Sequence, residues 1–305
     1  MQYQYYITDV FTDKPFNGAQ IAVLPQADGL NEARMQLIAR EFNLSETVFV
    51  FTPNGDCRRR SLRIFSPLRE IDFGGHPVIA AAHVLAATGV IKLEGKNTEI
   101  VLLQKAGNVK VNIIRDQDQV TMIQFTMKSH PIVDRFVPME DQIAEMLSLD
   151  EKNIEKEKYH TLMVSCGQPY LIVPIKSYQL VRKAKFNFDA WSQSIAPASL
   201  AREILLFSAH SELSISNFHA RLVGPDIGLH EDPPIGSAMP AFTGYLCAHE
   251  RVKKGTYTFV IDRGTAVTRR SVINIEMDNN ASRENEIRIA GPAVMISQGE
   301  ITIPG

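Results

Sequence analysis

The stretch Gly74-Gly75-His76-Pro77 opens an alanine-rich apolar segment that ends at Gly89. Proline just inside a helix start and glycine just past its end is the asymmetry that helices favour. The apolar run over residues 78–91 is too short to span a bilayer. The sequence therefore predicts a buried helix that starts near His76.

A second segment of the same kind occurs in the C-terminal half. Arg63-Ile64-Phe65-Ser66-Pro67 precedes the first glycine-rich helix start, and Arg221-Leu222-Val223-Gly224-Pro225 precedes another, Gly236-Ser237-Ala238. An acidic residue lies between the two parts in each case. A repeated unit of this size indicates a duplicated fold. The repeat predicts two similar α+β domains, each built around one central helix.

The repeat also suggests where the domains divide. Residues 129–138 contain two prolines and resemble a linker. We expect an N-terminal domain over residues 1–127 and a C-terminal domain over residues 128–292. The last strand, at about residues 293–305, is expected to cross back and complete the first domain.

Composition excludes several classes of function. The chain has 305 residues, 45% of them hydrophobic, and a formal net charge of −2 with acidic and basic residues mixed along it. Neither nucleic acid nor an anionic membrane is therefore an expected partner. The 3 cysteines are far apart and form no Cys-x-x-Cys pair, which fits a reducing compartment and excludes a cysteine zinc site of the usual spacing. Residues 1–6 lack the features of a secretory signal, so we expect a cytoplasmic protein.

The two glycine-rich helix starts are candidate anion sites. The first backbone N–H groups of a helix have no intrahelical acceptor, and the helix dipole adds positive potential there. Glycine lets a ligand approach the backbone closely. Gly75 and Gly236 with Ser237 therefore become candidate substrate-binding residues for a small acid gripped from two sides. A tight turn into a buried helix is the equally common alternative for either motif alone.

Glu46 is the candidate acid–base group. It lies in Asn43-Leu44-Ser45-Glu46-Thr47, between a helical pattern and an apolar strand. A carboxylate at the mouth of a buried run is a candidate for a raised pKa, which suits proton transfer near neutral pH. A helix cap or a partner for a nearby backbone group is the more common role of such a residue.

Three further polar residues accompany these motifs. His76 is a candidate to donate a hydrogen bond to substrate or to orient Glu46, although a histidine at a helix start is often only a satisfied polar group. Asp232 is either a helix cap or a polar contact for substrate. No Gly-x-Ser-x-Gly surrounds Ser237, which argues against acyl-enzyme chemistry. Metal-binding histidine spacings, Gly-x-Gly-x-x-Gly and the P-loop pattern are all absent from the sequence.

Together these motifs resemble the PhzF-like family of phenazine biosynthesis, nearly end to end. The matching segments, in order, are Asp9-Val10-Phe11, Phe16-Asn17-Gly18, Leu44-Ser45-Glu46-Thr47, Phe65-Ser66-Pro67 with Glu70, Gly75-His76, Glu231-Asp232-Pro233, Gly236-Ser237-Ala238, and Arg263-Gly264 with Arg269 and Ser271. Each is modest alone, but their order and spacing are specific.

The resemblance implies the diaminopimelate-epimerase-like fold, in which two domains each curve a β-sheet around a central helix and the active site lies between them. It implies a cofactor-free and metal-free isomerase, generally a homodimer, that acts on a dihydro-hydroxyanthranilate. The residue matching Glu46 moves the proton, and those matching His76, Asp232, Gly75, Gly236 and Ser237 hold the substrate.

Two alternatives remain open alongside this interpretation. One is an epimerase or racemase acting on another small acid, with Glu46 and Asp232 as its acid–base pair. The related two-thiol epimerases carry cysteines where this chain has Gly74 and Ile235, so a two-thiol reaction is disfavoured. The other alternative is a family member that binds a metabolite or protein without catalysis. Departures at Ala19-Gln20 and at Thr268 and Arg270 leave the substrate open.

Overall fold

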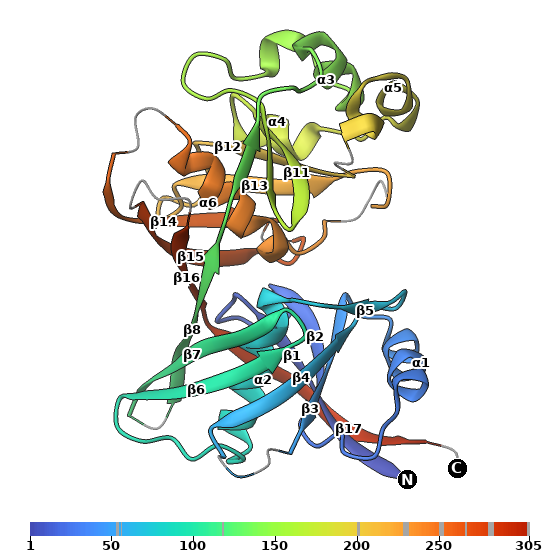
Figure 1. The fold of residues 1–305 in the computed structure, drawn as a ribbon, viewed down its shortest axis with the longest axis vertical. Helices are drawn as coiled ribbons and strands as arrows, with labels where there is room; N and C mark the ends of the chain where they lie inside the picture. The colour runs from blue at the N-terminus through green and yellow to red at the C-terminus, as the bar shows by residue number, and fades with distance from the viewer. Residues whose placement is uncertain are drawn as a thin grey trace. The chain divides into compact units, whose positions relative to one another are not determined.

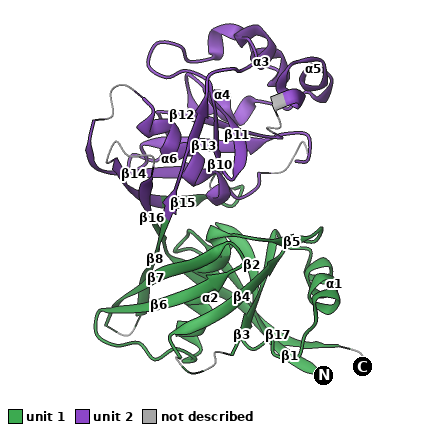
Figure 2. Ribbon diagram, viewed as in Figure 1, with its two compact units in different colours: residues 1–127, 265–273, 288–305 green, residues 128–264, 274–287 purple. Residues whose placement is uncertain are grey.

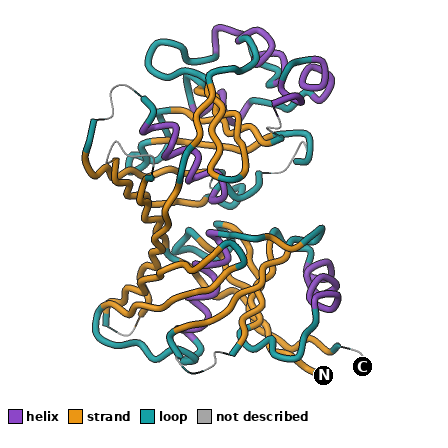
Figure 3. Tube along the Cα trace, viewed as in Figure 1, coloured by secondary structure: helices purple, strands orange, loops and turns teal. Residues whose placement is uncertain are grey.

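The computed structural model describes residues 1–52, 55, 57–117, 119–199, 202–227, 232–249, 253–265, 267–279 and 284–303. The chain divides into two compact units (Figure 2). Unit 1 comprises Met1–Met127, Thr265–Ile273 and Arg288–Gly305, and unit 2 comprises Lys128–Gly264 and Asn274–Ile287. Both consist largely of strands, with fewer helices (Figure 3).

Figure 1 shows the helices and strands along the chain. Those of unit 1 are β1 (Gln2–Val10), β2 (Ala19–Leu24), α1 (Glu32–Phe42), β3 (Glu46–Phe51), β4 (Arg59–Phe65), β5 (Glu70–Ile71), α2 (Gly75–Ala87), β6 (Asn97–Gln104), β7 (Gly107–Asp116) and β17 (Ala293–Thr302). Those of unit 2 are β9 (Ile132–Asp134), α3 (Glu140–Met146), β10 (Leu162–Cys166), β11 (Gln168–Pro174), α4 (Tyr178–Lys183), α5 (Phe188–Gln193), β12 (Glu203–Ser208), β13 (Phe218–Val223), α6 (Met239–Cys247) and β14 (Gly255–Arg263). Short 3-10 turns occur at Glu151–Asn153, Ala196–Ser199 and Gly236–Ala238, and β8 (Gln119–Ser129), β15 (Ser271–Asn279) and β16 (Asn285–Gly291) contribute residues to both units.

The pairing pattern of the strands confirms the predicted α+β duplication. In unit 1 the pairs β1–β2, β2–β3, β3–β4 and β4–β6 are antiparallel, parallel, antiparallel and parallel in turn. In unit 2 the pairs β10–β11, β11–β12, β12–β13 and β13–β14 follow the same order. The same succession of strand directions in both units indicates one repeated architecture.

Each unit encloses one central helix. All of α2 from Gly75 to Ala86 except His83 is buried, and the helix contacts β1, β2, β3, β7 and β17. A helix that is apolar all round is stable only when it is covered on all sides. Helix α6 is buried from Met239 to Leu246 in the same way and packs on β9, β10 and β11. The two predicted central helices are thus present.

The structure differs from the sequence expectations in detail. The second central segment begins as a 3-10 turn at Gly236–Ala238, and the α-helix proper starts at Met239. Pro240 favours a start at this point because it has no N–H to bond back into a preceding turn. Residues 129–138, predicted as a linker, contain β9, which pairs antiparallel with β10. Thr265–Ile273 groups with unit 1, although residues 128–292 were expected to form one domain.

An ion pair with a buried carboxylate and a partly exposed arginine joins distant segments of unit 1. The Asp9 carboxylate is fully buried; it accepts a hydrogen bond from the Phe16 N–H at 2.7 Å and pairs with the Arg269 guanidinium. Arg269 also donates to the carbonyls of Asn17 and Gly18, at 3.0 and 3.1 Å. The Gly18 N–H in turn donates to the Arg270 carbonyl at 2.8 Å. The pair therefore fixes the turn between β1 and β2 against the segment that enters β15.

Among the described residues, no helix has both the length and the apolar character needed to cross a membrane.

We expect Arg269→Met to lower the free energy of unfolding by about 3 kcal/mol at pH 7, because the Asp9 carboxylate stays buried without its cation. Burial raises the pKa of Asp9, with Arg269 and the Phe16 N–H acting against this, so the loss should shrink in acid as Asp9 takes up a proton. Urea unfolding of the wild type and the variant, at pH 7 and at an acidic pH where Asp9 is protonated, measures both effects.

Arg202→Met is the matched control, because Arg202 and its partner Asp226 are each 59% exposed. An exposed pair contributes less than about 1 kcal/mol. Equal losses in the two variants would contradict a structural role for the buried pair.

Candidate functional site

Glu46 stands at the entrance of a buried strand. It is the first residue of β3 and lies opposite Ile21 in the parallel pair with β2. The residue as a whole is partly exposed, but its carboxylate oxygen Oε2 is inaccessible to solvent and has no hydrogen-bond partner among the described residues. Burial alone raises the pKa of Glu46 to about 7. The carboxyl group is therefore able to lose and regain a proton near neutral pH.

The start of α2 lies against this carboxylate. Gly74 is the N-cap residue, in extended conformation, and makes no side-chain cap hydrogen bond of its own. A Cβ on Gly74 would lie 2.6 Å from Pro77 Cγ and 3.3 Å from Glu46 Oε1. A Cβ on Gly75 would lie 2.9 Å from Phe125 Cζ. Only glycine fits here without displacement of neighbours, which lets the backbone at the start of α2 lie close to the Glu46 carboxylate.

His76 is part of the same cluster but is packed as a core residue. Its side chain is 2% exposed, and its ring meets that of Phe11 edge-on, with centroids 4.9 Å apart. Gly75 and His76 follow Gly74, whose backbone lies against the Glu46 carboxylate, so three of the six candidate residues belong to this part of unit 1.

Gln104 joins this neighbourhood and was not predicted. It ends β6, is buried, and its Oε1 accepts a hydrogen bond from the Gly74 N–H at 2.9 Å. Gln104 and Gly74 are 30 residues apart, so no local pattern in the sequence points to this contact.

Asp232 belongs to unit 2 and has cationic surroundings. Arg263 Nη1 donates to the Asp232 backbone carbonyl and lies 3.7 Å from its carboxylate oxygen Oδ1. Burial raises the pKa of Asp232, whereas Arg263, Arg221, His219 and Arg182 act in the opposite direction. Asp232 therefore combines partial desolvation with nearby positive charge. The preceding Glu231, part of the predicted motif, lies outside the described residues.

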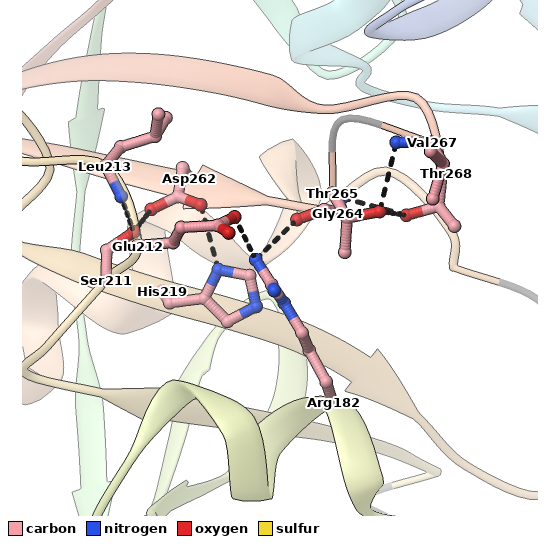
Figure 4. Close-up of polar contacts among 10 residues, drawn as sticks. All are labelled: Arg182, Ser211, Glu212, Leu213, His219, Asp262, Gly264, Thr265, Val267 and Thr268. Atoms are coloured by element: carbon pink, nitrogen blue, oxygen red, sulfur yellow. Dashed lines mark hydrogen bonds and ion pairs between the residues drawn. The ribbon is translucent and has the colours of Figure 1, made fainter.

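A buried polar pair that the sequence did not reveal stands beside Arg263. His219 Nδ1 lies 2.8 Å from Asp262 Oδ2, and the two side chains are 1% and 0% exposed. Figure 4 shows the Ser211 hydroxyl on the other Asp262 oxygen, and Arg182 between Glu212 and the Gly264 carbonyl. These contacts fix the end of β14, from which Arg263 reaches Asp232.

Gly236 and Ser237 form the 3-10 turn that leads into α6. Gly236 is buried, and Ser237 is exposed with its side chain hydrogen-bonded to Tyr170. Asp232, Gly236 and Ser237 thus lie within one short segment of unit 2.

The cysteines offer no reactive thiolate at the helix starts. Burial raises the pKa of both Cys166 and Cys247 to about 11, and Cys57 lies in the loop before β4. Across the part of the chain that the structure describes, no three His, Cys, Asp or Glu side chains are grouped as metal ligands.

Comparisons with known proteins agree with this architecture. An uncharacterized isomerase of Mesorhizobium japonicum is 30% identical over 304 residues, covering 98% of each chain. A trans-2,3-dihydro-3-hydroxyanthranilate isomerase of Pseudomonas chlororaphis is 25% identical over 309 residues, covering 99% of this chain and 100% of that one.

A solved structure shares the fold. The Bacillus anthracis phenazine biosynthesis protein of the PhzF family superposes with a TM-score of 0.86 at 22% identity, over 99% of this chain and 100% of that one. Residues 8–299 match the PhzC-PhzF family, described as phenazine biosynthesis-like protein. The chain therefore belongs to the PhzC-PhzF family and is an isomerase.

Proposed function

We propose that this isomerase moves a proton between two carbons of a small carboxylic acid, with Glu46 as the base and then the acid. The observation that supports this proposal is the Glu46 carboxylate itself, which is buried, lacks a partner for Oε2, and has its pKa raised to about 7. A group that must both take and return a proton works best when its pKa is near the working pH.

The proposed reaction has two proton transfers and no net change in atoms. The Glu46 carboxylate removes a proton from one carbon, and the electron pair left behind delocalises into the adjacent unsaturated system. The neutral carboxylic acid then returns the proton to a second carbon and is again ionised. The N–H of Gly75, at the positive end of α2, is suited to stabilise negative charge that develops on substrate during the first transfer.

The remaining candidates are assigned to substrate binding and orientation. We assign His76, beside Gly75, to a hydrogen bond with substrate. In unit 2, Gly236 and Ser237 supply a second helix start with an exposed hydroxyl, and Asp232 supplies a second carboxylate. These roles are proposals that rest on each residue's local setting within its own unit.

The substrate class follows from the relatives. The Pseudomonas chlororaphis relative is named for trans-2,3-dihydro-3-hydroxyanthranilate, a small cyclic carboxylic acid. We propose a substrate of this class, handled in the cytoplasm by a homodimer without metal or organic cofactor. No nucleic acid or membrane takes part in the proposed reaction.

A two-base epimerisation is the second candidate. It is favoured by one observation: burial raises the pKa of Asp232 as it does that of Glu46, so two carboxyl groups are candidates for proton transfer. The position of solvent label distinguishes the two reactions. In deuterated water, epimerisation places deuterium on the carbon that lost its proton, whereas isomerisation places it on a different carbon.

Glu46→Gln should lower turnover by about 100-fold or more, because glutamine keeps the shape but cannot exchange a proton. The first assay uses trans-2,3-dihydro-3-hydroxyanthranilate with EDTA present, followed by other small unsaturated carboxylic acids, and calorimetry checks that the variant still binds. Glu41→Gln, at an exposed position on α1, is the matched control. Full activity in Glu46→Gln would reject the proposed role of Glu46.

Glu46→Gln should also change how stability depends on pH. The pKa of Glu46 rises from 4.5 to about 7 in the folded protein, so within that window the folded chain holds a proton that the unfolded chain releases. The stabilising contribution is complete below about pH 4.5 and disappears as the pH rises through about 7.

Glutamine cannot ionise, so Glu46→Gln should match the wild type near pH 4.5 and exceed it by about 2–3 kcal/mol at pH 8. Denaturant unfolding of the wild type, Glu46→Gln and Glu41→Gln at the two pH values measures this difference. An unchanged difference between wild type and Glu46→Gln across the pH range would show that Glu46 is not desolvated.

A further inference from the structure

Gln104 connects the wall of unit 1 to the start of its central helix. It is the last residue of β6, where it pairs with Gly107 of β7, and the Ala106 N–H of the intervening turn donates to the Asp72 carbonyl at 3.0 Å. Gln104 is 7% exposed. Its side-chain oxygen Oε1 accepts a hydrogen bond from the Gly74 N–H at 2.9 Å. A glutamine held on a strand end thus fixes a backbone amide of the helix entrance.

This contact matters because the N-cap residue of α2, Gly74, has no side chain of its own with which to cap the helix. Gly74 is the residue whose backbone lies against the Glu46 carboxylate, since a Cβ placed there would be 3.3 Å from Oε1. Any rotation of the Gly74 peptide would move the Gly75 N–H and open the space beside Glu46. The Gly74 N–H is a donor and needs an acceptor. The oxygen of the Gln104 amide, rather than its nitrogen, therefore faces the start of α2.

The amide nitrogen is the other polar end of the Gln104 side chain. Its Nε2 is buried without a hydrogen-bond partner in the described part of the chain, and Gln104 lines a cavity of about 380 Å³. Arg63, Glu32, Glu70 and Lys105 also line this cavity, where Arg63 pairs with Glu32 and Glu70, and Lys105 pairs with Glu70. Lys105 also pairs with Asp72, outside the lining.

We propose that Gln104 is a positioning residue for the reaction: it holds Gly74 so that the α2 entrance stays closed against the Glu46 carboxylate and the Gly75 N–H stays aimed at substrate. The inference rests on the proposed function for its catalytic meaning. Its structural content, a fixed Gly74 and a desolvated Glu46, is measurable without any substrate.

Two variants of Gln104 distinguish the effect of losing the hydrogen-bond acceptor for Gly74 from the effect of adding a negative charge. Gln104→Leu removes the acceptor, so the Gly74 amide should exchange faster with solvent and water should reach Glu46. The pKa of Glu46 should then be about one unit lower than in the wild type, because its carboxylate is less desolvated. Gln104→Glu keeps an acceptor for Gly74 but adds a negative charge near Glu46. The Gly74 amide should then stay protected, while the pKa of Glu46 rises further.

The measurement is NMR: exchange of the Gly74 amide and titration of the Glu46 side-chain carbonyl carbon, assigned by its loss in Glu46→Gln. Gln124→Leu, at a half-buried glutamine of β8, is the matched control and should change neither signal. Opposite pKa shifts in Gln104→Leu and Gln104→Glu support the proposal, and a structural role alone would not produce them.

An unchanged Glu46 titration in both Gln104 variants would overturn the proposal. If Gln104→Leu does not fold, the titration of Glu46 in Gln104→Glu tests the proposal alone: a raised pKa of Glu46 supports it, and an unchanged pKa overturns it. Turnover of trans-2,3-dihydro-3-hydroxyanthranilate separates this inference from the proposed function. Shifted NMR signals with full activity in Glu46→Gln would refute the function but keep the positioning of Gly74. Inactive Glu46→Gln with wild-type NMR signals in both Gln104 variants would refute only the role of Gln104.

Discussion

The nearly complete burial of two central helices is the constraint on which the fold depends. Neither α2 nor α6 has a polar face, so each is stable only when strands cover it on all sides. Covering a helix in this way buries its first turn as well, where backbone N–H groups lack intrahelical acceptors. In unit 1 the glycines let strands and side chains approach that turn, and Gln104 satisfies the Gly74 amide. The site is therefore a consequence of how the helix is enclosed.

The same enclosure explains why the pKa of Glu46 is raised. Its strand enters the core one residue later, at Thr47, which is fully buried. The carboxylate consequently loses water without gaining a cation, and burial is the single cause that raises its pKa. Asp9 shows the contrasting case in the same unit: it is also buried, but Arg269 and the Phe16 N–H stabilise its charge. A carboxylate with partners holds the structure together, and one without partners is free for chemistry at the expense of stability.

The sequence predicted the features that local pattern controls. The proline near the start and the glycine after the end of α2 predicted this helix correctly. The repeated motifs predicted two similar α+β units with a central helix in each. What it did not predict depends on residues far apart in the chain. Gln104 meets Gly74 across 30 residues, and Asp262 meets His219 across 43. The motif Gly236-Ser237-Ala238 predicted a helix start at Gly236, but Pro240 lies beyond this motif and favours an α-helix that starts at Met239. The roles of Glu46, His76 and Asp232 stay predictions, since sequence and geometry indicate chemistry without measuring it.

The most direct test of the account is the titration of Glu46 in the wild-type protein. The side-chain carbonyl carbon of Glu46, identified by its disappearance in Glu46→Gln, is followed by NMR from acid to alkaline pH. We expect a midpoint near pH 7, because the carboxylate is desolvated and has no cationic partner. A midpoint close to the ordinary value of 4.5 would show that water or a charge stabilises the carboxylate, and would contradict the proposal that Glu46 is set to give and take a proton.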